Sequence, residues 1–184
     1  MVQDSLYLAG SSGPSRLVRF RLKDNYLRFY LRYVEPLKSK IQQGLTETLN
    51  IESLVKWDVI MGFQFENLVL NNIPALCSLL SINMNSVRSA SPYFQRTTQR
   101  HKACQIDLLI QTRHTLYVCE IKLRKKITRH IIPEVQDKIA RLKKPKNMTI
   151  RPVLIYEGEL DPSIVEEDFF DRCIHFADLL ECRP

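Results

Sequence analysis

One apolar segment, TLYVCEIKL at residues 115–123, places the strongest constraint on the fold. Its composition is that of a buried strand, yet Glu120 and Lys122 interrupt it. Side chains two residues apart on a strand point to the same face, so both charges share a face with Leu116 and Val118. Charged groups on an apolar face are costly unless they pair or bind something. The segment therefore predicts an internal strand that carries an ion-paired or functional site.

The surrounding pattern predicts a mixed α/β fold in which helices cover a sheet. Asp24 is expected to cap the first helix and Pro36 to end it. A hairpin turn is expected at Thr112–His114. Strands are expected at residues 18–22, 85–95, 103–111, 114–123 and 149–158. Helices are expected at residues 23–35, 57–71, 74–82, 130–144 and 161–172, and residues 172–181 are expected to form a terminal strand that runs into a short helix.

Composition narrows the class of protein. With 184 residues, 45% hydrophobic and 26% charged, the chain fits a globular domain with its own core. No apolar run approaches the ~20 residues that span a bilayer, and the N-terminus lacks a signal-peptide pattern. The five cysteines form no CxxC pair, which argues against a zinc site or a disulfide framework. We therefore expect a cytoplasmic protein with no membrane segment.

The net charge of +7 is unevenly distributed. Residues 16–40 and 122–146 are rich in Lys and Arg, whereas the chain from Glu157 onward is acidic. Such polarity predicts a basic face that meets a polyanion, with DNA as the expected partner. A solvated basic surface without a ligand is the alternative.

Two further carboxylates, Asp107 and Glu66, are expected to lie near Glu120 and Lys122. Asp107 lies across the expected hairpin, so antiparallel pairing would place it opposite Glu120, with Lys122 one pleat further along. Glu66 falls within an expected apolar helical stripe that contains Val59 and Phe63. Carboxylates beside a lysine suit Mg²⁺ or Mn²⁺ and a phosphate. The plain alternatives are a Glu120–Lys122 ion pair, and a Glu66 that is paired with an arginine, Arg88 or Arg100.

Two segments, QIDLLI with Asp107 and CEIKLRKK with Glu120 and Lys122, resemble the motif of the PD-(D/E)xK nuclease superfamily. Glu66 on a preceding helix agrees with that motif. Together with FRLKDNYLRFYLRYVEP and GFQFENLV, they are similar to the nuclease-like C-terminal domain of prokaryotic, archaeal-type AAA ATPases. The resemblance extends from Arg16 to the C-terminus, and the ATPase part is absent.

This resemblance implies a restriction-endonuclease-like mixed sheet with flanking helices at residues 51–184. Residues 1–50 would form an N-terminal extension of a strand and a helix, either a winged-helix remnant or a dimerisation segment. The resemblance also implies a metal site of Asp107, Glu120 and the Ile121 carbonyl. Asp107 and Glu120 thereby join the catalytic set, in which Lys122 is the catalytic lysine and Glu66 is accessory. Gln136 would be a supporting polar residue, or else a solvent-facing glutamine.

We therefore expect a Mg²⁺- or Mn²⁺-dependent DNA endonuclease that hydrolyses phosphodiester bonds. The alternative is a non-catalytic DNA-binding or partner-docking module that works with an AAA-type ATPase, in cis or in trans. A homodimer that covers the apolar N-terminal segment is a further expectation. The residues expected to contact nucleic acid are Arg100, Lys102, Arg124, Lys125, Lys126, Arg129, Lys138 and Arg141.

Overall fold

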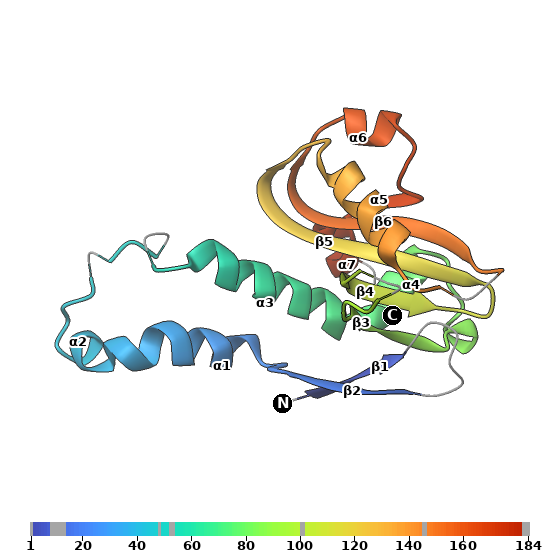
Figure 1. Ribbon diagram of the computed structural model, residues 1–184. Coiled ribbons are helices and arrows are strands. Elements are labelled where there is room, and N and C mark those ends of the chain that lie inside the picture. The colour runs from blue at the N-terminus through green and yellow to red at the C-terminus, as the bar shows by residue number, and fades with distance from the viewer. Residues whose placement is uncertain are drawn as a thin grey trace.

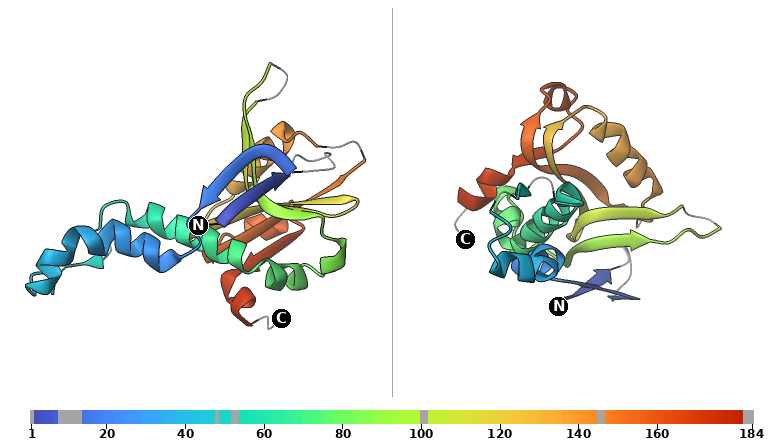
Figure 2. Two further views of the ribbon diagram at one scale, coloured as in Figure 1. Left: turned by 90° about the horizontal axis from the view of Figure 1, so that it is seen from below. Right: turned by 90° about the vertical axis from the view of Figure 1, so that its left-hand side faces the viewer.

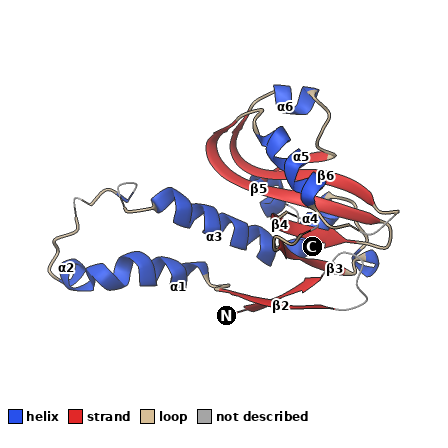
Figure 3. Ribbon diagram, viewed as in Figure 1, coloured by secondary structure: helices blue, strands red, loops and turns tan. Residues whose placement is uncertain are grey.

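A computed structural model describes residues 2–7, 14–47, 49–51, 54–99, 102–144 and 147–181, with side chains described from Phe20 onward. It confirms the predicted mixed α/β fold. A five-stranded sheet in the order β3-β4-β5-β6-β7 carries helices on both faces (Figures 1 and 3). The strands are β3 (Ser89–Gln95), β4 (Cys104–Gln111), β5 (Thr115–Ile127), β6 (Thr149–Leu160) and β7 (Arg172–His175).

Strand direction changes at the centre of this sheet. β4 runs antiparallel to both of its neighbours, β3 and β5, and the predicted hairpin joins β4 to β5. β5, β6 and β7 are parallel, so a crossover is needed between β5 and β6. Helix α5 (Ile131–Arg141) provides it. The opening segment thus becomes β5, which is paired on both sides, as its apolar composition predicts.

Two separate apolar clusters cover the two faces of the sheet. One face of β5, with Tyr117, Cys119 and Ile121, packs under helices α3 (Trp57–Asn71), α4 (Ile73–Leu79) and α7 (Phe176–Glu181). The other face, with Leu116 and Val118, packs under α5 and the short helix α6 (Ser163–Glu166). Glu120 therefore faces the α5 side, in agreement with the alternation predicted from sequence.

The N-terminal residues form a two-stranded ribbon and then a helical arm. β1 (Val2–Tyr7) pairs antiparallel with β2 (Pro14–Arg21). The arm then runs beside α3 and away from the sheet (Figures 1 and 2). It consists of α1 (Asn25–Phe29), the π-helical η1 (Tyr30–Val34), the 3₁₀-helical η2 (Glu35–Leu37), and α2 (Lys38–Gln42).

Aromatic packing joins the arm to α3. The rings of Phe29, Tyr33 and Trp57 contact one another with centroid separations between 5.7 and 6.4 Å. The Tyr33 hydroxyl donates to the Val55 carbonyl at 3.1 Å. Tyr33 is buried, so this cluster acts as a small core that holds the two helices side by side.

Some local expectations were right and others wrong. Asp24 caps α1, because its side chain accepts a hydrogen bond from the Leu27 N–H at 3.0 Å. Pro36 does not end the helix, since it lies in the first turn of η2, where no backbone donor is lost. The helix expected at 161–172 reduces to α6 because the chain turns at Asp168, which has a φ of 48°. No helix in the described part of the chain is long and apolar enough to span a membrane.

The predicted apolar stripe of α3 is wrong in its first half. Val59 and Phe63 are 53% and 47% exposed. They lie in the first half of α3, which runs beside the arm (Figure 1). The residues that α3 buries are Gln64, Phe65, Asn67, Val69 and Leu70. This leaves apolar surface on α3 that no described segment covers.

Candidate active site

The site lies where strands β4 and β5 separate. Their paired register ends at Leu108 opposite Cys119, and Asp107 and Glu120 are the next residues on the two strands. Instead of a backbone ladder, Asp107 Oδ2 accepts a hydrogen bond from the Ile121 N–H at 3.0 Å. The hairpin geometry expected from the sequence therefore brings these two acidic residues together, and the carboxylate fills the gap between the strands.

A β-bulge sets the direction of Asp107. Ser91 pairs with Leu109 and Tyr93 pairs with Ile106, so Pro92 alone faces both Asp107 and Leu108. A bulge of this kind bends the strand and re-aims a side chain. Proline suits the position because it has no N–H to leave unpaired in the broken ladder.

Glu120 is the centre of a buried charge cluster. Its side chain is fully buried, and Lys122 Nζ lies 2.6 Å from one carboxylate oxygen. Lys138 Nζ reaches Glu120 from α5 and lies 2.6 Å from the other oxygen and 2.7 Å from the first. An unpaired carboxylate at this depth would be very costly, and two ammonium groups offset that cost. The Glu120–Lys122 ion pair considered from sequence therefore exists, with a second cation beside it.

Burial and neighbouring charges raise the pKa values of Asp107 and Glu66. Burial raises the pKa of Asp107, and the neighbouring Glu120 raises it further, against the opposing effects of Lys138 and Lys122. Burial, followed by Asp107, raises the pKa of Glu66 to about 7. Glu66 has no hydrogen bond or ion pair within the described part of the chain. The cations that act on Glu66 are Lys122 and Arg28, and Arg28 comes from the arm.

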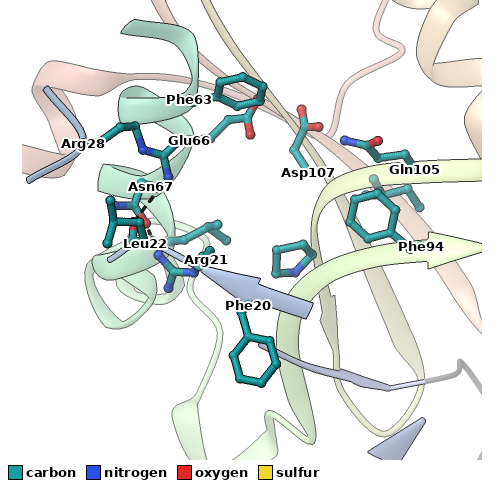
Figure 4. Close-up of a pocket in the computed structure, with 13 residues that line it drawn as sticks. Phe20, Arg21, Leu22, Arg28, Phe63, Glu66, Asn67, Phe94, Gln105 and Asp107 are labelled. Carbon is teal, nitrogen blue, oxygen red and sulfur yellow. Dashed lines mark hydrogen bonds between the residues drawn. The ribbon is translucent and has the colours of Figure 1, made fainter. Parts of the chain in front are cut away.

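Glu66 and Asp107 border a cavity of about 260 Å³ between the base of the arm, α3 and the β3–β4 pair (Figure 4). The two carboxylate side chains reach into it from opposite sides, Glu66 from α3 and Asp107 from β4. Arg28 and Phe63 lie on the α3 side. The site is therefore open to a ligand on one side of Asp107 and closed by α5 on the other.

The donor set partly fits a divalent cation. Within the described residues, no three His, Cys, Asp or Glu side chains form a metal-binding group. Both oxygens of Glu120 are held by lysines, so Glu120 would bind a cation only after releasing one of them. The remaining oxygen donors are Asp107, Glu66 and the Ile121 carbonyl, which points toward β4 because its N–H does. Mg²⁺ commonly takes one or two carboxylates and completes its shell with water.

Several residues expected at the site or on DNA are solvent-exposed or have partners within the protein. Gln136 is exposed on α5, and Lys138, expected on DNA, occupies the site instead. Arg129 is bound to Glu167 through two hydrogen bonds of 2.7 and 2.9 Å. Arg141 pairs with Asp137 one helical turn away. Arg124, Lys125, Lys126 and Lys102 are exposed, whereas Arg100 lies outside the described residues.

The role of Lys138 could have been found from the sequence. The buried residues of α5 and its end are Ile131, Ile132, Val135 and Leu142, and Lys138 falls between the last two on the same helical face. A cation in an apolar stripe indicates a buried anion nearby. Arg28 carried no such signal, because only the folded arm brings it to α3.

The chain matches a known protein family. Residues 30–135, more than half of the chain, match the family DUF234, described as archaea bacterial proteins of unknown function. The chain belongs to the DUF234 family. The matched span of this DUF234 chain contains Glu66, Asp107, Glu120 and Lys122, and it stops before Lys138.

A solved structure supports the fold of this DUF234 chain. It is similar to protein VC1899 from Vibrio cholerae, with 15% identity and a TM-score of 0.51. The likeness covers 86% of this chain and 47% of that protein, so the chain spans about half of its length. No curated protein matches. At this identity the likeness shows a shared fold only.

Proposed function

We propose that this DUF234 chain is a metal-dependent DNA nuclease of the PD-(D/E)xK type with a restriction-endonuclease-like fold. The observation that carries the proposal is the arrangement around Glu120. A fully buried carboxylate pairs with Lys122 at 2.6 Å, directly beside an Asp107 that faces an open cavity. Carboxylates with raised pKa values next to a lysine, in a cleft, are typical of a reactive site.

The proposal assigns a role to each group. When bound, Mg²⁺ or Mn²⁺ supplies a water of lowered pKa and neutralises phosphate charge. Asp107 and the Ile121 carbonyl would hold the ion, with Glu66 added once it is ionised. Lys122, 19% exposed, can turn from Glu120 toward a phosphate and stabilise its negative charge. Lys138 then keeps Glu120 neutralised and serves as a positioning residue.

DNA would be held by the end of β5. Arg124, Lys125 and Lys126 are consecutive and exposed just beyond Lys122. Contacts from such residues to phosphates are independent of sequence and weaken with salt. This location agrees with a strand of DNA that passes from the basic end of β5 toward Asp107.

A second candidate function is a docking module for an AAA-type ATPase or for a second copy of the chain. The observation that favours it is the apolar surface of the arm and the start of α3. Exposed large apolar side chains gather there. They are Tyr26, Leu31, Ile41, Leu45, Leu49, Ile51, Val55 and Val59. Light scattering on the purified chain, with Leu31→Glu as the test variant and Leu180→Glu as the control, separates a dimer from a monomer.

The nuclease proposal is tested by cleavage. The full chain is incubated with supercoiled, single-stranded and branched DNA in Mn²⁺, beside Asp107→Ala and Lys122→Ala. Glu181→Ala is the matched control, because Glu181 is an exposed acid at the end of α7, away from the basic end of β5. Cleavage that both site variants lose and the control keeps supports the nuclease. No cleavage of any substrate, with salt-sensitive DNA binding intact, would favour the docking or DNA-gripping module.

A further inference from the structure

We propose that the cavity beside Asp107, called here the arm-base cavity, binds one unpaired base of the DNA strand next to the cleaved phosphate. The residues that carry the inference are Arg28, Phe63, Glu66, Phe94, Gln105 and Asp107. The inference rests on the proposed nuclease function and deepens it. It names single-stranded or locally opened DNA as the preferred substrate.

The position of the cavity is the first observation. Its wall includes both Glu66 and Asp107, so a ligand inside it contacts the carboxylates of the site directly (Figure 4). Asp107 in turn accepts from the Ile121 N–H, one residue before Lys122. A strand with a phosphate at Lys122 would therefore have its neighbouring base at the mouth of this cavity.

Aromatic rings line the cavity on separate elements. Phe63 comes from α3 and is 47% exposed, whereas Phe94 comes from β3. Phe20, at the end of β2, is 63% exposed at the rim. Exposed phenylalanines around a concave polar site are unusual in a structural role. They are common where bases stack, because every base has a π-face and stacking tolerates any sequence.

Arg28 contributes a fixed cation to the cavity wall, and one of its N–H groups has no hydrogen-bond partner among the described residues. Its guanidinium lies 5.8 Å from the centre of the Phe63 ring, and Nη2 donates to the Leu22 carbonyl at 3.3 Å. Its Nε is buried and has no hydrogen-bond partner within the described part of the chain. A buried donor without a partner is costly, and an acceptor on a ligand would satisfy it. A base edge or a phosphate oxygen provides such an acceptor.

The floor near Arg28 is rigid. Asn67 donates to the Lys23 carbonyl at 2.6 Å and to Asn25 Oδ1 at 2.7 Å, and it accepts from Arg21. These bonds tie the base of the arm to α3. Because α3 also carries Phe63 and Glu66, the cavity is pre-formed and a ligand need not order it.

The volume of the arm-base cavity favours a single base over a base pair. About 260 Å³ lies just below the roughly 300–1,000 Å³ of drug-sized sites, so one planar base fits and a base pair does not. A base in duplex DNA would first have to leave its stack, which costs a few kcal/mol. An unpaired strand avoids that cost, so it should bind more tightly than a duplex.

The test measures binding without cleavage. In EDTA, fluorescence anisotropy compares a labelled single strand, the same strand with abasic sites, and the blunt duplex. The full chain should bind the normal strand at least about fivefold more tightly than the abasic strand or the duplex. This ratio corresponds to the lower limit of the stacking energy of one base on an aromatic ring. Phe63→Ala should remove that preference, and Arg28→Met should weaken it.

Matched variants separate this site from general charge and folding effects. Tyr26→Ala removes an exposed aromatic ring of the arm outside the cavity, and Arg32→Met removes an exposed cation of the same arm. Both should keep the preference. Equal affinity for normal, abasic and duplex DNA would overturn the inference, even if Mn²⁺-dependent cleavage occurs. A preference that depends on Phe63, without any cleavage, would support the base site and refute the nuclease.

Discussion

Lys138 of α5 and Glu120 of β5 form an ion pair inside the fold, with the ammonium nitrogen 2.6 Å from a carboxylate oxygen. Burial opposes the charge of Lys138, yet Asp107 and Glu120 outweigh that effect and raise its pKa. The pair ties the crossover helix to the central strand. It also leaves Lys122, on the other oxygen, as the cation that is able to leave for a substrate.

Lys138→Met should therefore destabilise the protein. Glu120 would keep only one partner, and a buried acceptor left under-satisfied costs about 1–3 kcal/mol in free energy of unfolding. Urea denaturation measures the loss. Lys144→Met, at an exposed position just beyond α5, should change stability by less than about 0.5 kcal/mol. Equal losses in the two variants would mean that the Lys138–Glu120 pair adds no stability.

The sequence predicted the central strand and its charges because alternation and hairpin register are local properties. Glu120 and Lys122 stood out against an apolar strand, and the pairing of β4 with β5 followed from the short turn. Lys138 was placed on DNA because its charge was counted with its basic neighbours. Its partner is 18 residues away on another element, so the contact depends on how α5 packs.

Glu66 should make stability depend on pH. Its pKa rises from 4.5 to about 7 in the folded protein, so the folded state keeps a proton that the unfolded chain releases between these values. Stability therefore falls as pH rises through this window. The side chain introduced by Glu66→Gln stays neutral, so this variant should not lose stability in this window. At pH 8 its free energy of unfolding should exceed that of the wild type by about 1–2 kcal/mol, after allowance for partial exposure.

Thermal denaturation at pH 5, 6, 7 and 8 provides the measurement. Glu159→Gln, at an acid that is 70% exposed, is the control and should follow the wild-type profile. Parallel profiles for Glu66→Gln and the wild type would show that Glu66 titrates near its ordinary pKa.

Divalent metal should reverse this pH trend. Mn²⁺ needs ionised carboxylates, so its binding at Asp107 and Glu66 should raise the Tm more at pH 8 than at pH 6. Asp107→Asn should abolish the shift at both values. A shift that survives in Asp107→Asn would place the ion elsewhere and would remove the metal from the proposed site.

Gly158 fixes the curve of β5 over the start of α3, where Gly158 borders a cavity with Trp57 and Met61. Leu123 pairs with Glu157 and Lys126 with Glu159, so Arg124 and Lys125 together face Gly158 across a bulge. Gly158 has a φ of +118°, and an added Cβ would collide with the Arg124 carbonyl oxygen. Gly158→Ala should lose about 2–4 kcal/mol from backbone strain and overpacking.

Gly62 offers the matched control for this substitution. It lies inside α3 with open space around its Cα, so Gly62→Ala should gain about 0.5–1 kcal/mol from the lower entropy of the unfolded chain. Urea denaturation compares the two variants. A Gly158→Ala protein as stable as the wild type would mean that the bulge relaxes freely.

The first half of α3 shows where prediction from sequence failed. Val59 and Phe63 were assigned to the core because they share a helical periodicity with buried residues. Periodicity identifies the apolar face of a helix and says nothing about where its covering layer ends. No described segment covers the side of α3 that carries Val59 and Phe63, and only the tertiary arrangement reveals this.

The exposed cations of β5 and those bound in ion pairs should differ in their effect on DNA binding. Lys125 is exposed in the bulge, whereas Nε and Nη2 of Arg129 donate to Glu167. Lys125→Ala should reduce the slope of log K against log salt by about 1, because one phosphate contact is lost. Arg129→Ala should change that slope less, since its guanidinium is already neutralised. Binding titrations from low to moderate NaCl measure both slopes, and a larger change for Arg129→Ala would move the DNA path from the end of β5 to α5.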